Sequence, residues 1–372
     1  MNTTLQTTFL FLAMSTSTFF SPVISWAQDG SATDLRVTHG PLLGRPGPDT
    51  MSLWVRTERP GAVKVFYGIQ KETLNREASI KTTSLEHDYT GIITLNGLEA
   101  NTRYYYRIAD HQLSGSFRTL PKASDFMNPE GNPDGLFNFK FEFACGNNQN
   151  GGGNSAGPTV PVFDTLNQQV RDEVHFAILN GDWLYEQRRD YSPHSWLHQV
   201  GLDSMKEAPH VVQKAPSIVG VWENYKVFLE RGKNLSEWHR HIPSFYTADD
   251  HELLNDIYGA GETGYVNRRA VFRDIGTQAW FDYLAWANPV KHDQPAWFGT
   301  GELQAKSDIL EDPKADFTKL DFKQLANLHV HWGTTTAGVP EAGLDAQPGN
   351  PNAAVYEIVE VLSPTRLRIK PA

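Results

Sequence analysis

Three short apolar segments beyond residue 136 each end in a polar cluster, and this repeated ending constrains the fold more than any other feature. The segments and their clusters are 137–144 with Cys145, 174–179 with Asp182, and 244–248 with Asp249 and Asp250. Helical spacing over 162–171 and over 222–238, with a break near Gly232, lies between them. Strands alternating with helices predict an α/β domain, in which the carboxyl ends of the strands converge on one edge. We therefore expect the three clusters to form one ligand site.

The chain before this region predicts a β-sandwich, because apolar and polar residues alternate with period two. The alternating runs are 52–56, 63–67, 89–95 and 103–108. Residues 97–106 resemble the part of a fibronectin type III domain where a leucine, a turn and a threonine lead into a corner tyrosine, here Tyr104. A generic aromatic strand is the alternative. We expect a fibronectin type III-like domain over 36–121, then a linker over 122–135 that is rich in Pro, Asn and Gly.

The first 27 residues predict an export signal. Residues 9–20 are apolar apart from Ser and Thr, and Ser25-Trp26-Ala27 places small residues at the −3 and −1 positions of a cleavage site. A short buried or anchoring segment is the alternative, because residues 1–8 carry no Lys or Arg. No other run approaches the roughly 18 to 20 apolar residues of a membrane span. We expect a periplasmic or secreted protein without a transmembrane segment after cleavage.

The formal net charge of -10 comes without a block of like charge, which argues against a nucleic-acid partner. A small phosphate ester remains possible, since it needs only a local positive site such as a metal ion. The single cysteine, Cys145, has no partner for an intrachain disulfide. It is therefore either inert packing or a residue held for its chemistry.

Two of the polar clusters contain residue types that bind metal ions. Asp182 follows Gly181, which permits a sharp turn, and Tyr185 can reach the same cation as a phenolate. An ordinary Gly-Asp turn is the alternative. The run Asp249-Asp250-His251-Glu252 is costly to bury unpaired, so it is exposed, mutually neutralised or metal-bound. An exposed acidic helix N-terminus is the alternative here, and the strand before the run favours a site.

The order strand-Cys, Gly-Asp-x-x-Tyr-Glu and Asp-Asp-His-Glu resembles the PhoD family of alkaline phosphatases and phosphodiesterases. The resemblance covers about residues 35–260. It implies an α+β and α/β two-domain fold, with an N-terminal sandwich and a four-layer α/β/β/α metallophosphatase domain over 136–372 that is incomplete here. It also implies an exported hydrolase whose substrates are small phosphomonoesters or phosphodiesters.

The same resemblance implies the residues of the site. The candidate metal ligands are Cys145, Asp182, Tyr185, Asp249 and Asp250. Fe³⁺ would be held by Cys145, Asp182 and Tyr185, and Asp182 would bridge to Ca²⁺ beside Asp250; Zn²⁺ and Mn²⁺ are alternatives. His251 would orient or protonate the phosphate, and Asn148 would face the same site. Metal-bound hydroxide would attack phosphorus directly, without a covalent intermediate.

The sequence departs from the family pattern after about residue 260. A later Asp-x-Arg strand and a Gly-Asp-x-His motif, which supply further ligands in the family, are not found. Two alternating runs, 355–362 and 367–369, predict a pair of strands instead. His329 and His331 share one face of a predicted strand and are candidate metal ligands, with phosphate contact or packing as alternatives.

Two explanations fit the missing motifs. The sequence is a fragment of a longer phosphatase, which the three intact motifs favour, or a pseudoenzyme that serves as a calcium- or ligand-binding surface module. A diesterase for wall teichoic acid or phospholipid is a further alternative. Arg188, Arg189 and Arg268 are candidate phosphate contacts, although surface solvation is the expected role of each.

Overall fold

The computed structural model describes residues 35–81, 84–108, 113–136, 139–150, 157–256, 270–289, 296–304, 306–320, 327–330 and 354–370. The predicted export signal over 1–27 lies outside these residues. No helix in the described ranges is long and apolar enough to cross a bilayer.

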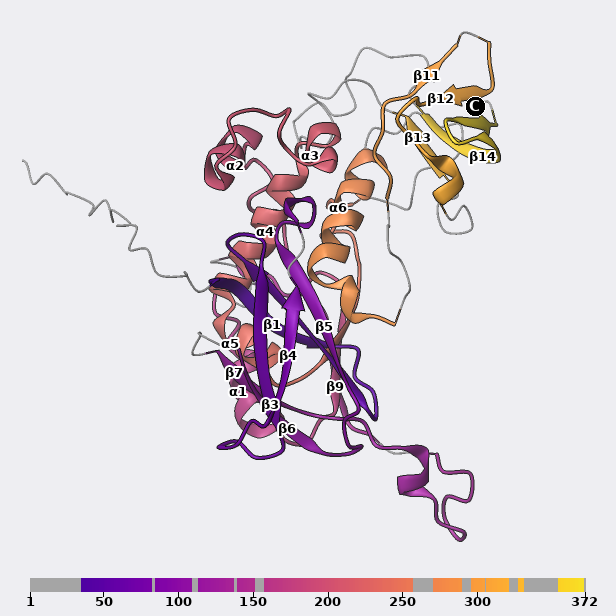
Figure 1. Cartoon of the computed structure of the whole chain (residues 1–372). Helices are drawn as coiled ribbons and strands as arrows, with labels where there is room; N and C mark the ends of the chain where they lie inside the picture. Colours follow the sequence, from indigo (N-terminus) through magenta and orange to yellow (C-terminus); the bar gives the residue numbers. More distant parts are fainter. Residues whose placement is uncertain are drawn as a thin grey trace, which may run out of the picture. The chain divides into compact units, whose positions relative to one another are not determined.

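Two antiparallel sheets enclose one apolar core between residues 37 and 118, and the predicted β-sandwich is confirmed (Figure 1, indigo to purple). The first sheet has the order β1 (Val37–Gly44), β2 (Thr50–Thr57) and β5 (Thr90–Asn96). The second has the order β4 (Arg76–Lys81), β3 (Ala62–Gly68), β6 (Arg103–Ile108) and β7 (Ser114–Arg118). The 3-10 helices η1 (Leu85–His87) and η2 (Ala123–Phe126) precede β5 and follow β7.

The corner tyrosine expected in the sandwich is present. The hydroxyl of Tyr104 accepts a hydrogen bond from the Glu99 backbone N–H at 2.9 Å. The Tyr104 ring is buried and stacks on Phe117 with 5.5 Å between ring centroids. The hydroxyl thus closes the turn before β6 while the ring fills the core between the sheets.

A three-stranded parallel sheet follows, in the order β10 (Ser244–Thr247), β9 (Phe176–Asn180) and β8 (Phe141–Ala144). Helix α1 (Val162–Gln169) connects β8 to β9, while α4 (Ile218–Arg231) and α5 (Lys233–His239) precede β10. The helix break predicted near Gly232 separates α4 from α5, so that prediction is confirmed. The remaining helices of this region are α2 (Pro193–Val200), α3 (His210–Lys214), α6 (Ala270–Tyr283) and η3 (Ala285–Ala287).

The two faces of the parallel sheet differ. The face that carries Ala177, Leu179 and Tyr246 packs into the large apolar core that the helices form. The opposite face carries Phe141, Phe143, Phe176, Ile178 and Phe245, which we call the aromatic face. Phe141 stacks on Phe176 at 5.5 Å, yet Phe141 and Phe143 remain 47% and 59% exposed. Of the four layers that the family resemblance implies, the described residues therefore show one β layer with helices on one side.

The sandwich and the helices share buried contacts. Leu42 of β1 and Trp54 of β2 belong to the helix core and not to the sandwich core. The Trp54 indole N–H donates to the backbone oxygen of Asp282 at 2.9 Å. The buried Asp88 carboxylate accepts two guanidinium hydrogen bonds from Arg56, both at 2.9 Å, and one from the Tyr283 hydroxyl at 2.5 Å.

The C-terminal part of the described chain forms a separate five-stranded sheet. Its order is β11 (Glu302–Leu303), β12 (Ile309–Glu311), β15 (Arg366–Ile369), β14 (Ala354–Ser363) and β13 (Asn327–Val330). The 3-10 helix η4 (Phe317–Lys319) packs against it. The strand pair predicted over 355–362 and 367–369 is confirmed as β14 and β15, which pair antiparallel.

Candidate metal centre

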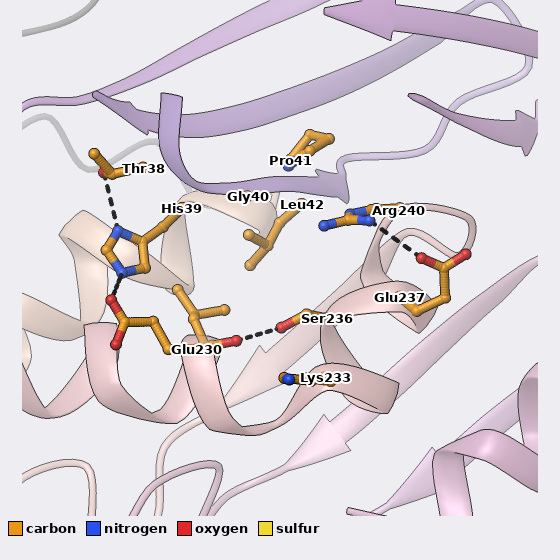
Figure 2. A pocket seen from close by; sticks show the side chains of 11 residues that line it. Thr38, His39, Gly40, Pro41, Leu42, Glu230, Lys233, Ser236, Glu237 and Arg240 are labelled. Atoms are coloured by element: carbon orange, nitrogen blue, oxygen red, sulfur yellow. Dashed lines mark hydrogen bonds and ion pairs between the residues drawn. The ribbon is translucent and has the colours of Figure 1, made fainter. Parts of the chain in front are cut away.

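A cavity of about 440 Å³ lies between β1 and the α4–α5 turn (Figure 2). Its polar side chains largely pair with one another: His39 Nε2 contacts Glu230 at 3.2 Å, and Arg240 contacts Glu237 at 3.2 Å. Burial lowers the pKa of His39. None of the cavity's lining residues comes from the polar clusters at the strand ends, so the cavity holds no part of the predicted chemistry.

The loops that follow the three parallel strands lie side by side. The backbone N–H groups of Gly146 and Asn147, after β8, donate to the carbonyl oxygens of Gly181 and Asp182, after β9, at 3.2 and 2.7 Å. Gly181 has φ +78°, and a Cβ built on it would lie 2.5 Å from the Cβ of Asp249, after β10. Only glycine permits both this backbone conformation and this close approach.

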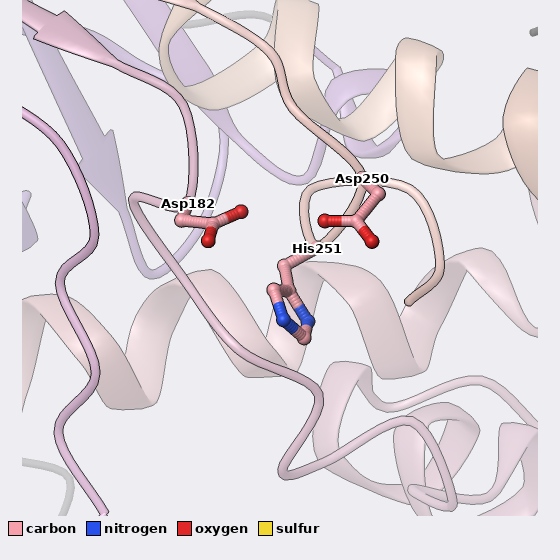
Figure 3. Close-up of side chains that lie close together, drawn as sticks. All are labelled: Asp182, Asp250 and His251. Carbon is pink, nitrogen blue, oxygen red and sulfur yellow. The ribbon is translucent and has the colours of Figure 1, made fainter. Parts of the chain in front are cut away.

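Three side chains at these strand ends form a possible metal site. One ligand atom from each of Asp182, Asp250 and His251 lies within 4.8 Å of the others. The carboxylates of Asp182 and Asp250 point toward each other from different loops (Figure 3). Asp182 has φ +54°, an uncommon conformation for a residue with a side chain, and such strain gathers at functional sites.

The two carboxylate oxygens of Asp182 differ in their hydrogen bonds. Its Oδ2 accepts a hydrogen bond from the Tyr185 hydroxyl at 3.0 Å. Its Oδ1 is buried and has no hydrogen-bond partner in the described structure. Burial raises the pKa of Asp182, and burial together with the Asp182 charge raises the pKa of Tyr185. A buried carboxylate oxygen without a donor is costly in an empty site and well suited to a cation.

His251 is held in place by Glu186. His251 Nδ1 donates to Glu186 Oε2 at 2.7 Å, and the His251 ring lies 4.0 Å from the Tyr185 ring. Burial lowers the pKa of His251, but the Glu186 hydrogen bond and the charges of Asp182 and Asp250 outweigh it and raise the pKa. Because Nδ1 is engaged, Nε2 is the ring nitrogen that remains for a ligand.

Glu252 and Arg189 connect these loops, a role that the sequence did not assign to either residue. The buried Glu252 carboxylate accepts hydrogen bonds from three backbone N–H groups, those of Asp182, Trp183 and Asp249. Arg189 donates to the backbone oxygens of 251–253, and its Nε atom is buried. The expectation of surface solvation for Arg189 is therefore wrong: its guanidinium serves the backbone of the β10 loop. The neighbouring Arg188 is exposed, and Arg268 lies outside the described residues.

Three other predicted residues lie on the same loops but not in the Asp182–Asp250–His251 group. Cys145 is exposed at the end of β8, and its sulfur is not part of that group. Asp249 is exposed, with its backbone N–H on Glu252. Asn148 is half-buried, and its side-chain oxygen accepts from the Asn150 N–H at 2.9 Å. The β8 loop therefore meets the site through backbone contacts, while the ligand-type side chains come from the β9 and β10 loops.

His329, one of the two histidines predicted as a pair, lies away from the Asp182–Asp250–His251 group. His329 lies on β13, and its Nδ1 contacts Asp274 Oδ2 on α6 at 2.6 Å. His331 lies outside the described residues. His329 is not a member of the Asp182 group.

Comparisons with known proteins give matches over both parts of the chain. A family model described as the N-terminal domain of PhoD-like phosphatases matches residues 24–121, and the model of PhoD-like phosphatases matches residues 140–330. No curated protein matches the chain.

Solved structures also match. A structure of PhoD is 18% identical, with a TM-score of 0.49, and the match covers 73% of this chain and 51% of that one. A purple acid phosphatase from yellow lupin (Lupinus luteus) seeds is 13% identical, with a TM-score of 0.40, covering 70% and 42%. The chain thus spans about half the length of the first of these structures.

Proposed function

Because the chain belongs to the PhoD-like phosphatase family, we propose that it hydrolyses small phosphate monoesters or diesters with the help of metal ions held at the ends of β9 and β10. The observation that carries this proposal is the Asp182–Asp250–His251 group, whose ligand atoms lie within 4.8 Å of one another. The group comes from two of the three strand ends at which the family motifs lie.

The residues present fit a metal ion. Asp182 Oδ1 is buried without a hydrogen-bond partner, and carboxylate, imidazole and phenol groups are the ligand types that iron, zinc, manganese and calcium accept. Asp182, Asp250 and Tyr185 would hold the cation, with Cys145 and Asp249 as further ligands that loop adjustment would bring in. We retain Fe³⁺ and Ca²⁺ as the expected pair. A bound cation supplies Lewis-acid chemistry, which activates water and neutralises charge on a phosphate group.

The chain's own residues supply proton chemistry and orientation. Glu186 accepts from His251 Nδ1 and fixes the ring, so His251 Nε2 would orient a phosphate oxygen or the leaving group, or transfer a proton to it. We do not assign Arg189 as a phosphate contact, because its guanidinium already donates to backbone oxygens. Asn148 would be a second donor to phosphate through its side-chain N–H₂ group.

We propose export as part of this function. The apolar run and small-residue cleavage pattern in 1–27 support removal of this segment and a periplasmic or secreted mature chain. Edman sequencing of the protein recovered from the producing cells checks this: a mature N-terminus at Gln28 is expected, whereas an N-terminus at Met1 would contradict it.

The test of the enzymatic proposal is metal content and turnover of Asp182→Asn beside the wild type. Plasma mass spectrometry would measure iron, calcium, zinc and manganese, and p-nitrophenyl phosphate and bis-p-nitrophenyl phosphate would report turnover. We expect stoichiometric metal in the wild type, and loss of metal with at least about a 100-fold fall in kcat/KM in the variant. The matched control is Asp164→Asn, an exposed aspartate on α1, which should change neither.

Two results would contradict the proposal. Wild-type protein that folds but holds no metal and turns over neither ester is not an enzyme in this form. Metal that binds without turnover would favour the binding-module alternative.

A further inference from the structure

Glu252 is a buried carboxylate with an unusual set of partners. Its exposed fraction is 0%, and among the described residues the hydrogen-bond donors to its oxygens are backbone N–H groups. Oε1 accepts from the Trp183 backbone N–H at 2.5 Å, and Oε2 accepts from the Asp182 and Asp249 N–H groups at 3.1 and 2.9 Å. Burial of a charge without compensation is costly; the three N–H donors offset part of that cost, although burial still raises the pKa of Glu252.

The partners of Glu252 come from two different loops. Asp182 and Trp183 follow β9, while Asp249 follows β10 together with Glu252 itself. One side chain therefore joins the backbone of both loops that carry the metal-ligand candidates. The Asp182 N–H that it holds belongs to the residue with φ +54°, the conformation that most needs support from its surroundings.

We propose that Glu252 is a positioning residue that fixes the separation of Asp182 from Asp250 and thereby sets the affinity of the site for a metal ion. This inference rests on the proposed function in assigning the two aspartates as ligands. Glu252 touches neither ligand atom. Its effect passes through the backbone: the carboxylate holds the turn at 182–183 against the turn at 249–250, so the two side chains converge without paying for loop ordering when the ion binds.

The chemistry of the acceptor makes the proposal testable by conservative substitution. Glu252→Gln keeps the size, but one carboxylate oxygen becomes an N–H₂ group that faces backbone donors. Glu252→Asp keeps both oxygens but shortens the side chain by one methylene, which withdraws it from one of the two loops. Glu173→Gln is the matched control, because Glu173 is exposed and pairs with Lys140 at the surface.

The affinity measurement uses Tb³⁺ alone, an oxygen-seeking ion whose luminescence on tryptophan excitation reports binding near Trp183. We expect Glu252→Gln to weaken Tb³⁺ binding about 10- to 100-fold, the range for loss of a partner behind the ligands, and Glu252→Asp to fall between it and the wild type. Glu173→Gln should bind as the wild type does. Glu252→Gln that folds, by circular dichroism, and binds Tb³⁺ with wild-type affinity would overturn the proposal.

Hydrogen exchange measured by mass spectrometry gives a second readout that needs neither metal nor substrate. In the metal-free wild type, the amides of 182, 183 and 249 should exchange as slowly as the amides of β9. Rapid exchange there would overturn the proposal even if neither variant folds. Both readouts are independent of turnover. A wild type that hydrolyses no ester would therefore contradict the proposed function, while the positioning role of Glu252 would still be tested by Tb³⁺ affinity and hydrogen exchange.

Discussion

The N-terminal sandwich and the parallel sheet differ in how much of their apolar surface is buried. The two sheets of the sandwich share one core, to which the first sheet contributes Leu53 and Val55 and the second contributes Tyr104 and Phe117. The parallel sheet buries one face under helices and leaves Phe141 and Phe143 on the other about half exposed. Parallel sheets are normally covered on both faces. The aromatic face therefore differs from the inner faces of the sandwich in keeping apolar side chains exposed among the described residues.

The same contrast holds for two carboxyl groups, those of the buried Asp88 and the half-buried Glu142. Asp88, between η1 and β5, is fully satisfied by Arg56 and Tyr283 and has Lys226 at 3.9 Å. Glu142, on β8, has a buried Oε2 with no partner in the described structure. Burial raises the pKa of both carboxyls; the charges of Lys226 and Arg56 reverse this for Asp88 and bring its pKa to about 2, whereas Glu142 stays at about 7. Both oxygens of Asp88 are therefore satisfied, whereas one oxygen of Glu142 is not.

Removal of the Asp88 charge should have the largest effect on stability. Asp88→Asn removes the carboxylate that pairs with the buried Arg56, while Lys226 keeps Glu223 at 2.9 Å, and we expect a loss of about 3–5 kcal/mol in the free energy of unfolding. Urea unfolding followed by circular dichroism would measure it. The control, Asp172→Asn, breaks an exposed pair with Arg103 and should cost at most about 1 kcal/mol. Equal effects of the two changes would mean that the buried pair is solvated in solution.

A pair of phenylalanine truncations compares the two surfaces directly. Phe117→Ala in the sandwich core should cost about 3–5 kcal/mol. Phe143→Ala on the aromatic face should cost less than about 1 kcal/mol, because the side chain is already largely in water. The same urea experiment measures both. A Phe143→Ala loss as large as that of Phe117→Ala would show that the aromatic face is covered in solution.

The smallest effect is expected from Glu142 and depends on pH. Its folded pKa of about 7 is above the ordinary value of 4.5, so this group's contribution is fully present below pH 4.5 and is lost as the pH rises through about 7. Glu142→Gln, which does not ionise, should therefore unfold at the wild-type temperature at pH 4.5 and a few degrees higher at pH 8, the difference being limited by solvent screening. Differential scanning calorimetry checks this.

Asp88 gives the opposite trend and serves as the reference. Its lowered pKa means that its contribution is present above pH 3.8 and is lost as the pH falls through about 2. A Glu142→Gln variant that gains nothing at pH 8 would indicate that Glu142 reaches a partner in solution, and the contrast between the two acids would disappear.

Local patterns allowed much of this structure to be predicted. The corner formed by Tyr104 depends on ten consecutive residues, and the ends of β8, β9 and β10 depend on short apolar runs followed by Gly-Asp or Asp-Asp. The juxtaposition of Asp182 with Asp250 follows because parallel strand ends share an edge.

What the sequence could not give is the direction of individual side chains. Asp-Asp-His-Glu contains three acids of similar chemistry, and nothing local indicates that Asp250 faces the site, Asp249 faces water and Glu252 turns inward to the backbone. The hydrogen bonds of the Arg189 guanidinium likewise depend on carbonyl groups some 60 residues later in the chain. The exposure of Phe143 was equally hidden, because an apolar run is typical of a buried strand.

The place of Trp54 and Leu42 in the helix core has a consequence for protein engineering and for gene recombination. A truncation within the linker over 122–135 would separate the sandwich from the helices. The helix core would then lose the Leu42 and Trp54 side chains, and both side chains would be exposed to solvent on the isolated sandwich. The sandwich is therefore not a domain that can be exchanged between proteins without changes to its surface. Swaps with a sandwich from another protein should succeed only when the donor brings matching side chains at positions 42 and 54.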